Sequence, residues 1–374
     1  MRTSFLPVSL LCHLLLATGS LIAGDQLFNL AEVPMKSRTV ITQDYWPSKP
    51  GEAAVCMWQN DKLAAMSITI DDNEAPNVDW WLETADKYQV PLTWFIITDD
   101  VGGPDKFVRG TWDLWARVLA KGHAIESHTM THLRESLHPE TWKGIDWEYG
   151  ESQKQITAGI PGHQAHFLAY PGGPIAKAND PTVAAKYYLA ARGTNGYPNG
   201  ATTIDYLNVN AMSSARIGGT GGAWSDLNNL LDKNLFNGRQ YGGWVVLLYH
   251  YVKPPYDTVL PKLEFYQANR AKFWFGLFGD VARYGQERDT STLAIKESVA
   301  DRIILSLTDR MDDRLYDFPL TVKIRLPDSW QGVSAQQAGK AVTSRIVMHE
   351  GARHALVDAV PDKGEIVLIP TAGK

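Results

Sequence analysis

The stretch Ser67-Ile68-Thr69-Ile70-Asp71-Asp72-Asn73 joins an apolar run to two adjacent carboxylates and an asparagine. The run predicts a strand over residues 66–70 that is followed by a turn, which Pro76 and Asn77 also favour. Neighbouring residues of a regular strand point to opposite faces of a sheet. Both aspartates can therefore reach one site only if the strand ends there, as the turn residues predict.

Short β-type runs alternate with helical patterns from about residue 55 to residue 290. Besides 66–70, we expect strands at 92–97, 124–126, 167–170 and 244–249, and helices at 77–88, 112–121 and 148–157. This alternation is typical of an α/β fold in which helices cover a parallel sheet. The unbroken apolar run 244–249 suits a strand that is buried on both faces.

Residues with useful chemistry follow four of the expected strands. They are Asp71-Asp72 after the first strand, His128 and His132 after 124–126, Pro171-Gly172-Gly173 after 167–170, and His250 after 244–249. The carboxyl ends of the strands in a parallel barrel lie on one face, where catalytic groups gather. The four segments are therefore expected to converge.

The pair His128 and His132, together with one aspartate, can supply a two-histidine, one-carboxylate metal site. Histidines four apart can share one face of a helical turn, with Cβ atoms about 5 to 6 Å apart. A divalent metal lowers the pKa of the water that it binds, and the second aspartate can accept a proton as the water attacks a carbonyl. The pattern thus indicates a metal-dependent hydrolase. The alternative is that the aspartates cap the next helix and the histidines are surface residues.

The composition excludes several kinds of partner. Hydrophobic residues make up 44% and charged residues 21% of the 374 residues, which is typical of a soluble globular protein with a catalytic domain and a smaller companion. The net charge is -5, and no stretch is dense in Lys and Arg, so nucleic acids and anionic membranes are poor ligands. The sequence does not indicate an oligomeric state.

Residues 1–24 predict a secretory signal peptide, because Arg2 precedes an apolar stretch that ends in small residues. A retained N-terminal helix is the alternative. Removal of this segment leaves Cys56 as the single cysteine, so we expect a secreted or periplasmic protein without an intramolecular disulfide. No later stretch approaches the roughly 20 apolar residues of a transmembrane helix.

The composition shifts after Asp289. Residues 303–370 combine alternating patterns, such as Val322-Lys323-Ile324-Arg325-Leu326, with turn signals at Glu350-Gly351. We therefore expect a barrel domain over residues 25–290 and a small antiparallel β domain over residues 291–374. The second domain carries no cluster of ligands or nucleophiles, which favours a role in packing or carbohydrate contact.

Four motifs resemble, in their order, those of the polysaccharide deacetylases, carbohydrate esterase family 4. They are Ser67 to Asn73, Glu126-Ser127-His128-Thr129-Met130-Thr131-His132, Ala169-Tyr170-Pro171-Gly172-Gly173, and Leu248-Tyr249-His250. The resemblance covers about residues 60–290 and excludes the C-terminal β domain. It implies an irregular (β/α) barrel that removes N-acetyl or O-acetyl groups from an acetylated glycan.

The resemblance also implies catalytic and metal-binding roles. Asp71 is the expected general base and His250 the expected general acid. Asp72, His128 and His132 are the expected metal ligands. Two imidazoles and a carboxylate suit Zn²⁺, although Co²⁺, Ni²⁺ or Mn²⁺ fit the same ligands.

Four further residues are expected beside the substrate: Tyr170, Pro171, Gly172 and Leu248. By the resemblance, Leu248 lines the pocket for the acetyl methyl group, and the backbone N–H of Gly172 helps to hold the oxyanion.

The sequence departs from the family in two places. Ala169 stands where many members have an arginine that steadies the catalytic aspartate, and we expect Arg192 to replace it beside Asp71. The segment 207–212 lies where an aspartate-and-tryptophan motif belongs, but it contains neither residue. His250 is therefore expected to lack its usual carboxylate partner.

Two other functions stay open at this point. A non-haem iron oxygenase can also use two histidines and a carboxylate to hold Fe(II). A carbohydrate-binding protein that has lost activity is the second alternative, which the missing arginine favours. The retained ligands, base and acid favour hydrolysis over both.

Overall fold

A computed structural model describes residues 45–135, 140, 142–174, 179–213 and 228–372. The expected signal peptide lies outside these residues and stays a prediction. Within the described ranges, no helix is long and apolar enough to cross a membrane. Cys56 is buried and carries a free thiol.

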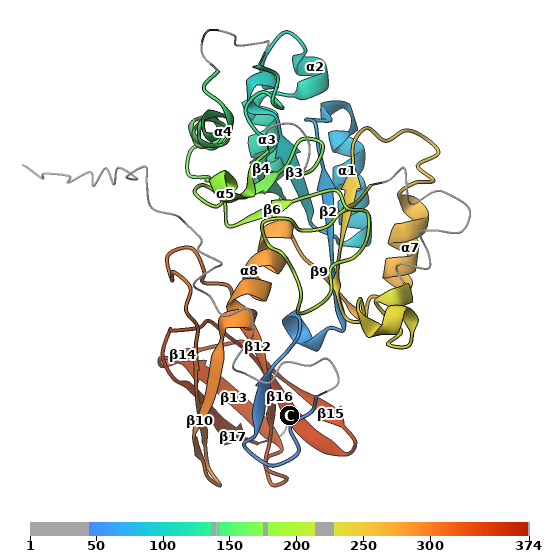
Figure 1. The fold of residues 1–374 in the computed structure, drawn as a ribbon. Coiled ribbons are helices and arrows are strands. Elements are labelled where there is room, and N and C mark those ends of the chain that lie inside the picture. Colours follow the sequence, from blue (N-terminus) through green and yellow to red (C-terminus); the bar gives the residue numbers. More distant parts are fainter. Residues whose placement is uncertain (1–44, 136–139, 141, 175–178, 214–227, 373–374) are drawn as a thin grey trace, which may run out of the picture.

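A parallel sheet forms the upper part of the molecule (Figure 1). Its strands are β2 (Ala64–Ile70), β3 (Leu92–Ile96), β4 (Ala124–Ser127), β5 (Phe167–Ala169), β6 (Ala190–Arg192), β7 (Met212–Ser213), β8 (Trp244–Tyr249) and β9 (Phe273–Phe275). The strand order is β6-β5-β4-β3-β2-β8-β7, and β9 pairs with β2. Every residue of β2 and β8 is buried, as expected for central strands that are covered on both faces.

Helices follow most of these strands and cover the sheet. They are α1 (Val78–Tyr88), α2 (Lys106–Arg109), α3 (Trp112–Ala120), α4 (Ile145–Gly159), α5 (Pro181–Ala184), α7 (Leu260–Ala268) and α8 (Phe278–Thr290). α3 begins where the Thr111 side chain accepts from Leu114 N–H, and it ends just before Gly122, whose φ is 86°. The helices expected from the sequence are confirmed within a few residues of their ends.

The lower part of the molecule consists of two antiparallel sheets (Figure 1). Their strands are β1 (Ala53–Val55), β10 (Thr292–Ser298), β11 (Ile303–Thr308), β12 (Leu320–Arg325), β13 (Gly332–Gln337), β14 (Lys340–Ala341), β15 (Ser344–His349), β16 (Ala352–Ala359) and β17 (Ile366–Thr371). The sheets have the orders β1-β12-β16-β15 and β10-β11-β17-β13-β14. β1 comes from the N-terminal side of the barrel segment and pairs with β12.

The predicted fold class is confirmed. Among the described residues, the ladders of the parallel sheet end at β6 and β7 without closing a ring, so the barrel is irregular, and antiparallel sheets follow it in the chain. The domain boundaries at residues 24 and 290 stay predictions.

Candidate metal and catalytic site

The turn after β2 directs both aspartates toward one site. Asp72 and Asn73 adopt left-handed conformations, with φ of 64° and 55°. Asn73 holds the turn, because its amide donates to the Ile97 carbonyl (3.0 Å) and its side-chain oxygen accepts from Ile97 N–H (2.6 Å). Asparagine tolerates this conformation better than most residues. The expected end of the strand at Ile70 is confirmed, and it allows adjacent residues, Asp71 and Asp72, to face the same histidine.

His128 and His132 lie in an irregular loop after β4, so the helical turn expected from their spacing is wrong. Thr129 and His132 have φ of 66° and 60°, and these left-handed residues fold the loop back. The two imidazole rings thereby come to 4.9 Å between centroids. Such conformations cost of order 1–3 kcal/mol for residues other than glycine, and they cluster at functional sites.

The buried imidazole of His128 is held in one tautomer. Its Nδ1 lies 2.8 Å from the carbonyl oxygen of Ala169, at the end of β5. A carbonyl can only accept, so Nδ1 carries a proton, and in the neutral imidazole Nε2 is the nitrogen that keeps its lone pair. Nε2 lies 3.4 Å from Asp72 Oδ1 and 3.7 Å from Asp71 Oδ2. A carbonyl behind the ring is a common way to orient a histidine that ligates a metal.

One carboxylate oxygen of Asp72 lies beside both imidazoles. Oδ1 is 3.4 Å from His128 Nε2 and 3.6 Å from His132 Nε2, and it is buried without a hydrogen bond from any described residue. Ligands held tetrahedrally at about 2.0–2.1 Å from Zn²⁺ lie about 3.3 Å from one another. The ligand atoms of the three residues all lie within 4.8 Å of each other. Their donor types and spacing therefore fit a divalent cation.

The environment of Asp72 favours its carboxylate form. Burial raises the pKa of Asp72, but the neighbouring His128 lowers it, as do His250 and His132 to a smaller degree. The lowering prevails, so the pKa of Asp72 lies well below its usual range. A ligand to a cation has to be deprotonated, and Asp72 meets this condition at neutral pH.

Arg192 reaches Asp71 from the strand next to the position of the missing family arginine. Ala169 and Arg192 are direct partners in the β5–β6 ladder, so their side chains point to the same face of the sheet. The guanidinium of Arg192 is fully buried, and its Nη2 donates to Asp71 Oδ2. It also lies 5.4 Å from the centre of the Phe95 ring. The structure brings together the two residues that we expected to interact, and their catalytic roles stay predictions.

His250 follows β8 and lies at the open edge of the site. Its side chain is 49% exposed, and its Nε2 lies 3.7 Å from Asp72 Oδ2, the oxygen that the other two histidines do not face. The segment 207–212 contains no carboxylate, as the sequence shows. Asp72 is the described carboxylate within ion-pair distance of His250.

The four residues expected beside the substrate lie after β5 and in β8. Leu248 and Pro171 are buried, whereas Gly172 is exposed and has φ of 71°. Tyr170 is fully buried, and its hydroxyl donates to the Leu207 carbonyl at 2.9 Å. The side chain of Tyr170 therefore hydrogen-bonds within the protein interior. The exposed part of this turn is the backbone of Gly172.

Glu148 holds the loop between the two histidines, a role that no sequence pattern indicates. It is fully buried in α4, and its Oε2 accepts from Thr131 N–H at 2.8 Å. Its Oε1 accepts from the Thr131 hydroxyl and from Trp142 Nε1, while its backbone carbonyl accepts from Met130 N–H. A helical glutamate with these neighbours looks like any surface glutamate in the sequence.

We expect Glu148→Gln to weaken the binding of Zn²⁺ by about 10–100-fold, the usual cost of losing an outer partner of a metal site. Glutamine offers one acceptor oxygen where glutamate offers two, so either Thr131 or Trp142 loses its acceptor. Calorimetric titration with Zn²⁺ measures the effect. Glu151→Gln is the matched control, because Glu151 lies on the same helix and pairs with Lys154 at the surface. Equal affinities of the two variants would contradict the expectation.

One family profile matches the part of the chain that contains the candidate site. Residues 59–189 match the family profile named polysaccharide deacetylase. This range contains the aspartate pair, both loop histidines and the turn after β5, so the resemblance inferred from the motifs is confirmed. Residues 59–189 are therefore similar in sequence to the polysaccharide deacetylases.

Three individual proteins are also similar to this chain. A gellan lyase from Bacillus sp is 35% identical in an alignment of 375 residues that covers 93% of this chain. The chain spans 14% of the length of that protein. The Xyl-CE4 domain of a multidomain xylanase from the hindgut metagenome of Trinervitermes trinervoides is 18% identical with a TM-score of 0.38, over 59% of this chain and 89% of that domain. A polysaccharide deacetylase from Bacillus cereus is 18% identical with a TM-score of 0.37, over 57% of this chain and 92% of its own.

Proposed function

We propose that this protein is a metal-dependent deacetylase that hydrolyses N-acetyl or O-acetyl groups on a polysaccharide or oligosaccharide. The observation that carries the proposal is the group of Asp72, His128 and His132, with Asp71 and His250 beside it. The family match supports the reaction class, because it covers three of the four motifs.

In the proposed reaction, Asp71 accepts a proton from the attacking water, and His250 donates a proton to the leaving amine or alcohol. The buried guanidinium of Arg192 pairs with Asp71 and holds its carboxylate in position. His250 is half exposed and can exchange its proton with solvent between turnovers. The backbone N–H of Gly172 is proposed to stabilise the oxyanion, and Leu248 to contact the acetyl methyl group.

Asp72, His128 and His132 would hold the metal. A divalent ion at this position polarises the acetyl carbonyl and lowers the pKa of water. We propose Zn²⁺, because two imidazoles and one carboxylate suit it, while Co²⁺, Ni²⁺ and Mn²⁺ fit the same donors. The tautomer of His128, with its Nε2 lone pair toward Asp72, supports this assignment.

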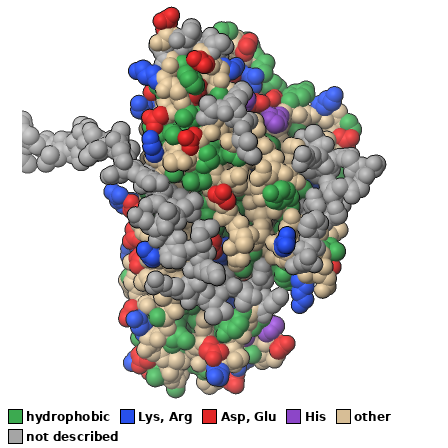
Figure 2. Space-filling model, in the orientation of Figure 1, with side chains coloured by type: hydrophobic (Ala, Val, Ile, Leu, Met, Phe, Trp, Pro, Cys, Tyr) green, Lys and Arg blue, Asp and Glu red, His purple; other side chains and the backbone are tan. Residues whose placement is uncertain are grey.

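We propose a secreted or periplasmic location from the N-terminal pattern, and an acetylated glycan as the substrate. The net charge is -5, and acidic and basic side chains are interspersed over the face drawn in Figure 2. A nucleic-acid-binding surface would gather its basic residues in a patch or stripe. We further propose that residues 25–290 form the catalytic domain, and that residues 291–374 form a β domain for packing or carbohydrate contact.

Acetate release from acetylated glycans tests the proposal. Purified protein is incubated with N-acetylglucosamine oligosaccharides and with acetylated xylan, with and without a chelator. We expect acetate from at least one of them, and we expect the chelator to stop its release. A turnover that consumes O₂ with bound iron would favour the oxygenase alternative instead. No acetate from a broad set of acetylated glycans would contradict the proposed function.

We expect Arg192→Ala to lower the rate of acetate release. Without the guanidinium, the buried Asp71 carboxylate loses the ion-pair and hydrogen-bond partner that holds it in position. Arg192→Lys is the control, because it keeps a positive charge near Asp71. An unchanged rate of acetate release in Arg192→Ala would show that Arg192 does not support the base.

A further inference from the structure

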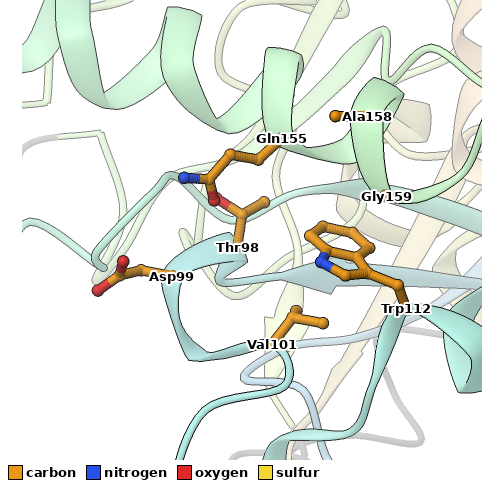
Figure 3. A pocket seen from close by; sticks show the side chains of 7 residues that line it. All are labelled: Thr98, Asp99, Val101, Trp112, Gln155, Ala158 and Gly159. Atoms are coloured by element: carbon orange, nitrogen blue, oxygen red, sulfur yellow. The ribbon is translucent and has the colours of Figure 1, made fainter.

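A pocket of about 440 Å³ lies between α4, the start of α3 and the short turn Thr98–Asp100 after β3. Figure 3 shows side chains from these three segments around one space. The turn is hydrogen-bonded to the loop between the two site histidines, since Thr98 N–H donates to Thr129 and Asp99 N–H donates to Met130. The pocket therefore lies on the other side of a turn that supports the candidate metal site.

Several polar groups in the lining have no partner among the described residues. The Thr98 hydroxyl is buried, with the residue 3% exposed, and forms no hydrogen bond. No hydrogen bond is formed by the Gln155 amide or the Trp112 indole N–H with the part of the chain that the structure describes. Gln153, two residues earlier on α4, instead donates to the carbonyls of Ala165 and Tyr187. Gln153 thus hydrogen-bonds within the protein, whereas the side chain of Gln155 points into the pocket (Figure 3).

The indole of Trp112 is fixed in position. A Cβ atom at Gly159 would lie 2.1 Å from Trp112 Cδ2, so the helix backbone packs directly against the ring. In Figure 3 the ring nitrogen is directed toward the space between Thr98 and Val101. A donor held in place in this way loses little side-chain entropy when a ligand binds.

The chemistry of the lining selects one class of ligand. Neither Lys nor Arg lines the pocket, and Asp99 adds a carboxylate, which disfavours phosphates, sulfates and carboxylates. Val101 and Ala158 are the aliphatic lining residues, too few for an acyl chain. The Gln155 amide and the Trp112 indole N–H offer donors and an acceptor beside an aromatic edge, which matches the alternating hydroxyl and C–H groups of a sugar ring. The volume lies within the usual range for small-ligand pockets, about 300–1,000 Å³.

We propose that this pocket is a secondary glycan-binding site that holds one pyranose ring. Trp112 Nε1 and the Gln155 amide would hydrogen-bond to the ring hydroxyls. The proposal rests on the proposed function only for the source of the sugar, a glycan whose acetyl groups are removed at the metal site.

The resonance of the Trp112 indole N–H tests the proposal in the full-length, metal-free protein. The resonance is assigned by its loss in Trp112→Phe, and hexasaccharides of N-acetylglucosamine and of glucose are then titrated. We expect the resonance to shift to saturation with at least one probe. We also expect the dissociation constant to rise at least tenfold in Gln155→Ala and in Ala158→Tyr, which fills the pocket.

Thr157→Tyr is the matched control, because Thr157 is exposed on the same helix and does not line the pocket. It should bind like the unmodified protein. An unmoved Trp112 resonance with both probes, or equal binding by Ala158→Tyr and Thr157→Tyr, would overturn the proposal. Acetate release is measured separately on the same glycans, so the loss of the proposed function and the loss of this site are distinguishable.

Discussion

Replacing Asp71 by asparagine is expected to lower the rate of acetate release by about 10²–10⁴-fold, the usual contribution of a positioned acid or base. Asparagine keeps the shape of the side chain and can still accept from Arg192, but it cannot take a proton from water. The three proposed metal ligands are unchanged, so the metal content should match that of the unmodified protein. Steady-state kinetics and metal analysis of the same sample measure both quantities.

The control for this variant is Asp79→Asn. Asp79 lies at the exposed start of α1 and pairs with Arg117 at the surface. Its loss should leave the rate and the metal content unchanged, because surface ion pairs contribute little. Near-normal turnover by Asp71→Asn would show that another group is the base. Loss of metal in the same variant would instead show that Asp71 supports the cation.

The convergence of the motifs could be predicted because it depends on local patterns. A long apolar run such as 244–249 identifies a buried strand, and in a parallel sheet the residues after each strand meet at one edge. The turn at Asp72 was also predictable, since Asn73 is one of the few residues that favour a left-handed conformation.

Other parts of the site depend on contacts that no local pattern contains. Thr129 adopts positive φ although β-branched residues disfavour it, so the spacing of the histidines wrongly suggested a helical turn. Glu148 lies on a helix that follows the loop, and its contacts exist only once α4 packs against β4. Similarly, β1 belongs to a sheet whose other strands come from the C-terminal part of the chain.

Arg192 is an intermediate case. The sequence suggested it as a substitute for the missing arginine, but β6 has only three residues and is too short to recognise by pattern. The register of β5 and β6 explains how Arg192 comes to lie beside Asp71, because Ala169 and Arg192 are paired across the ladder. A guanidinium can therefore reach Asp71 from either of two adjacent strands.

Removal of the metal should have an effect at least as large as the loss of Asp71. We expect a chelator to abolish acetate release and added Zn²⁺ to restore it. His132→Ala should lose metal and activity together, because it removes one of the three proposed ligands. Its Zn²⁺ affinity should fall by more than the roughly 10–100-fold expected for the loss of an outer partner such as Glu148. Metal analysis and the visible spectrum of the Co²⁺ form measure occupancy independently of turnover.

His349→Ala is the control for this variant, since His349 lies in β15 of the antiparallel sheets. It should keep full metal occupancy and full activity. The order of Zn²⁺ affinities then separates a direct ligand from a supporting residue: unmodified protein, Glu148→Gln, and last His132→Ala. If His132→Ala bound Zn²⁺ as tightly as the unmodified protein, the cation would have to be held elsewhere. The 3.6 Å distance between His132 Nε2 and Asp72 Oδ1 would then not indicate a shared metal ion.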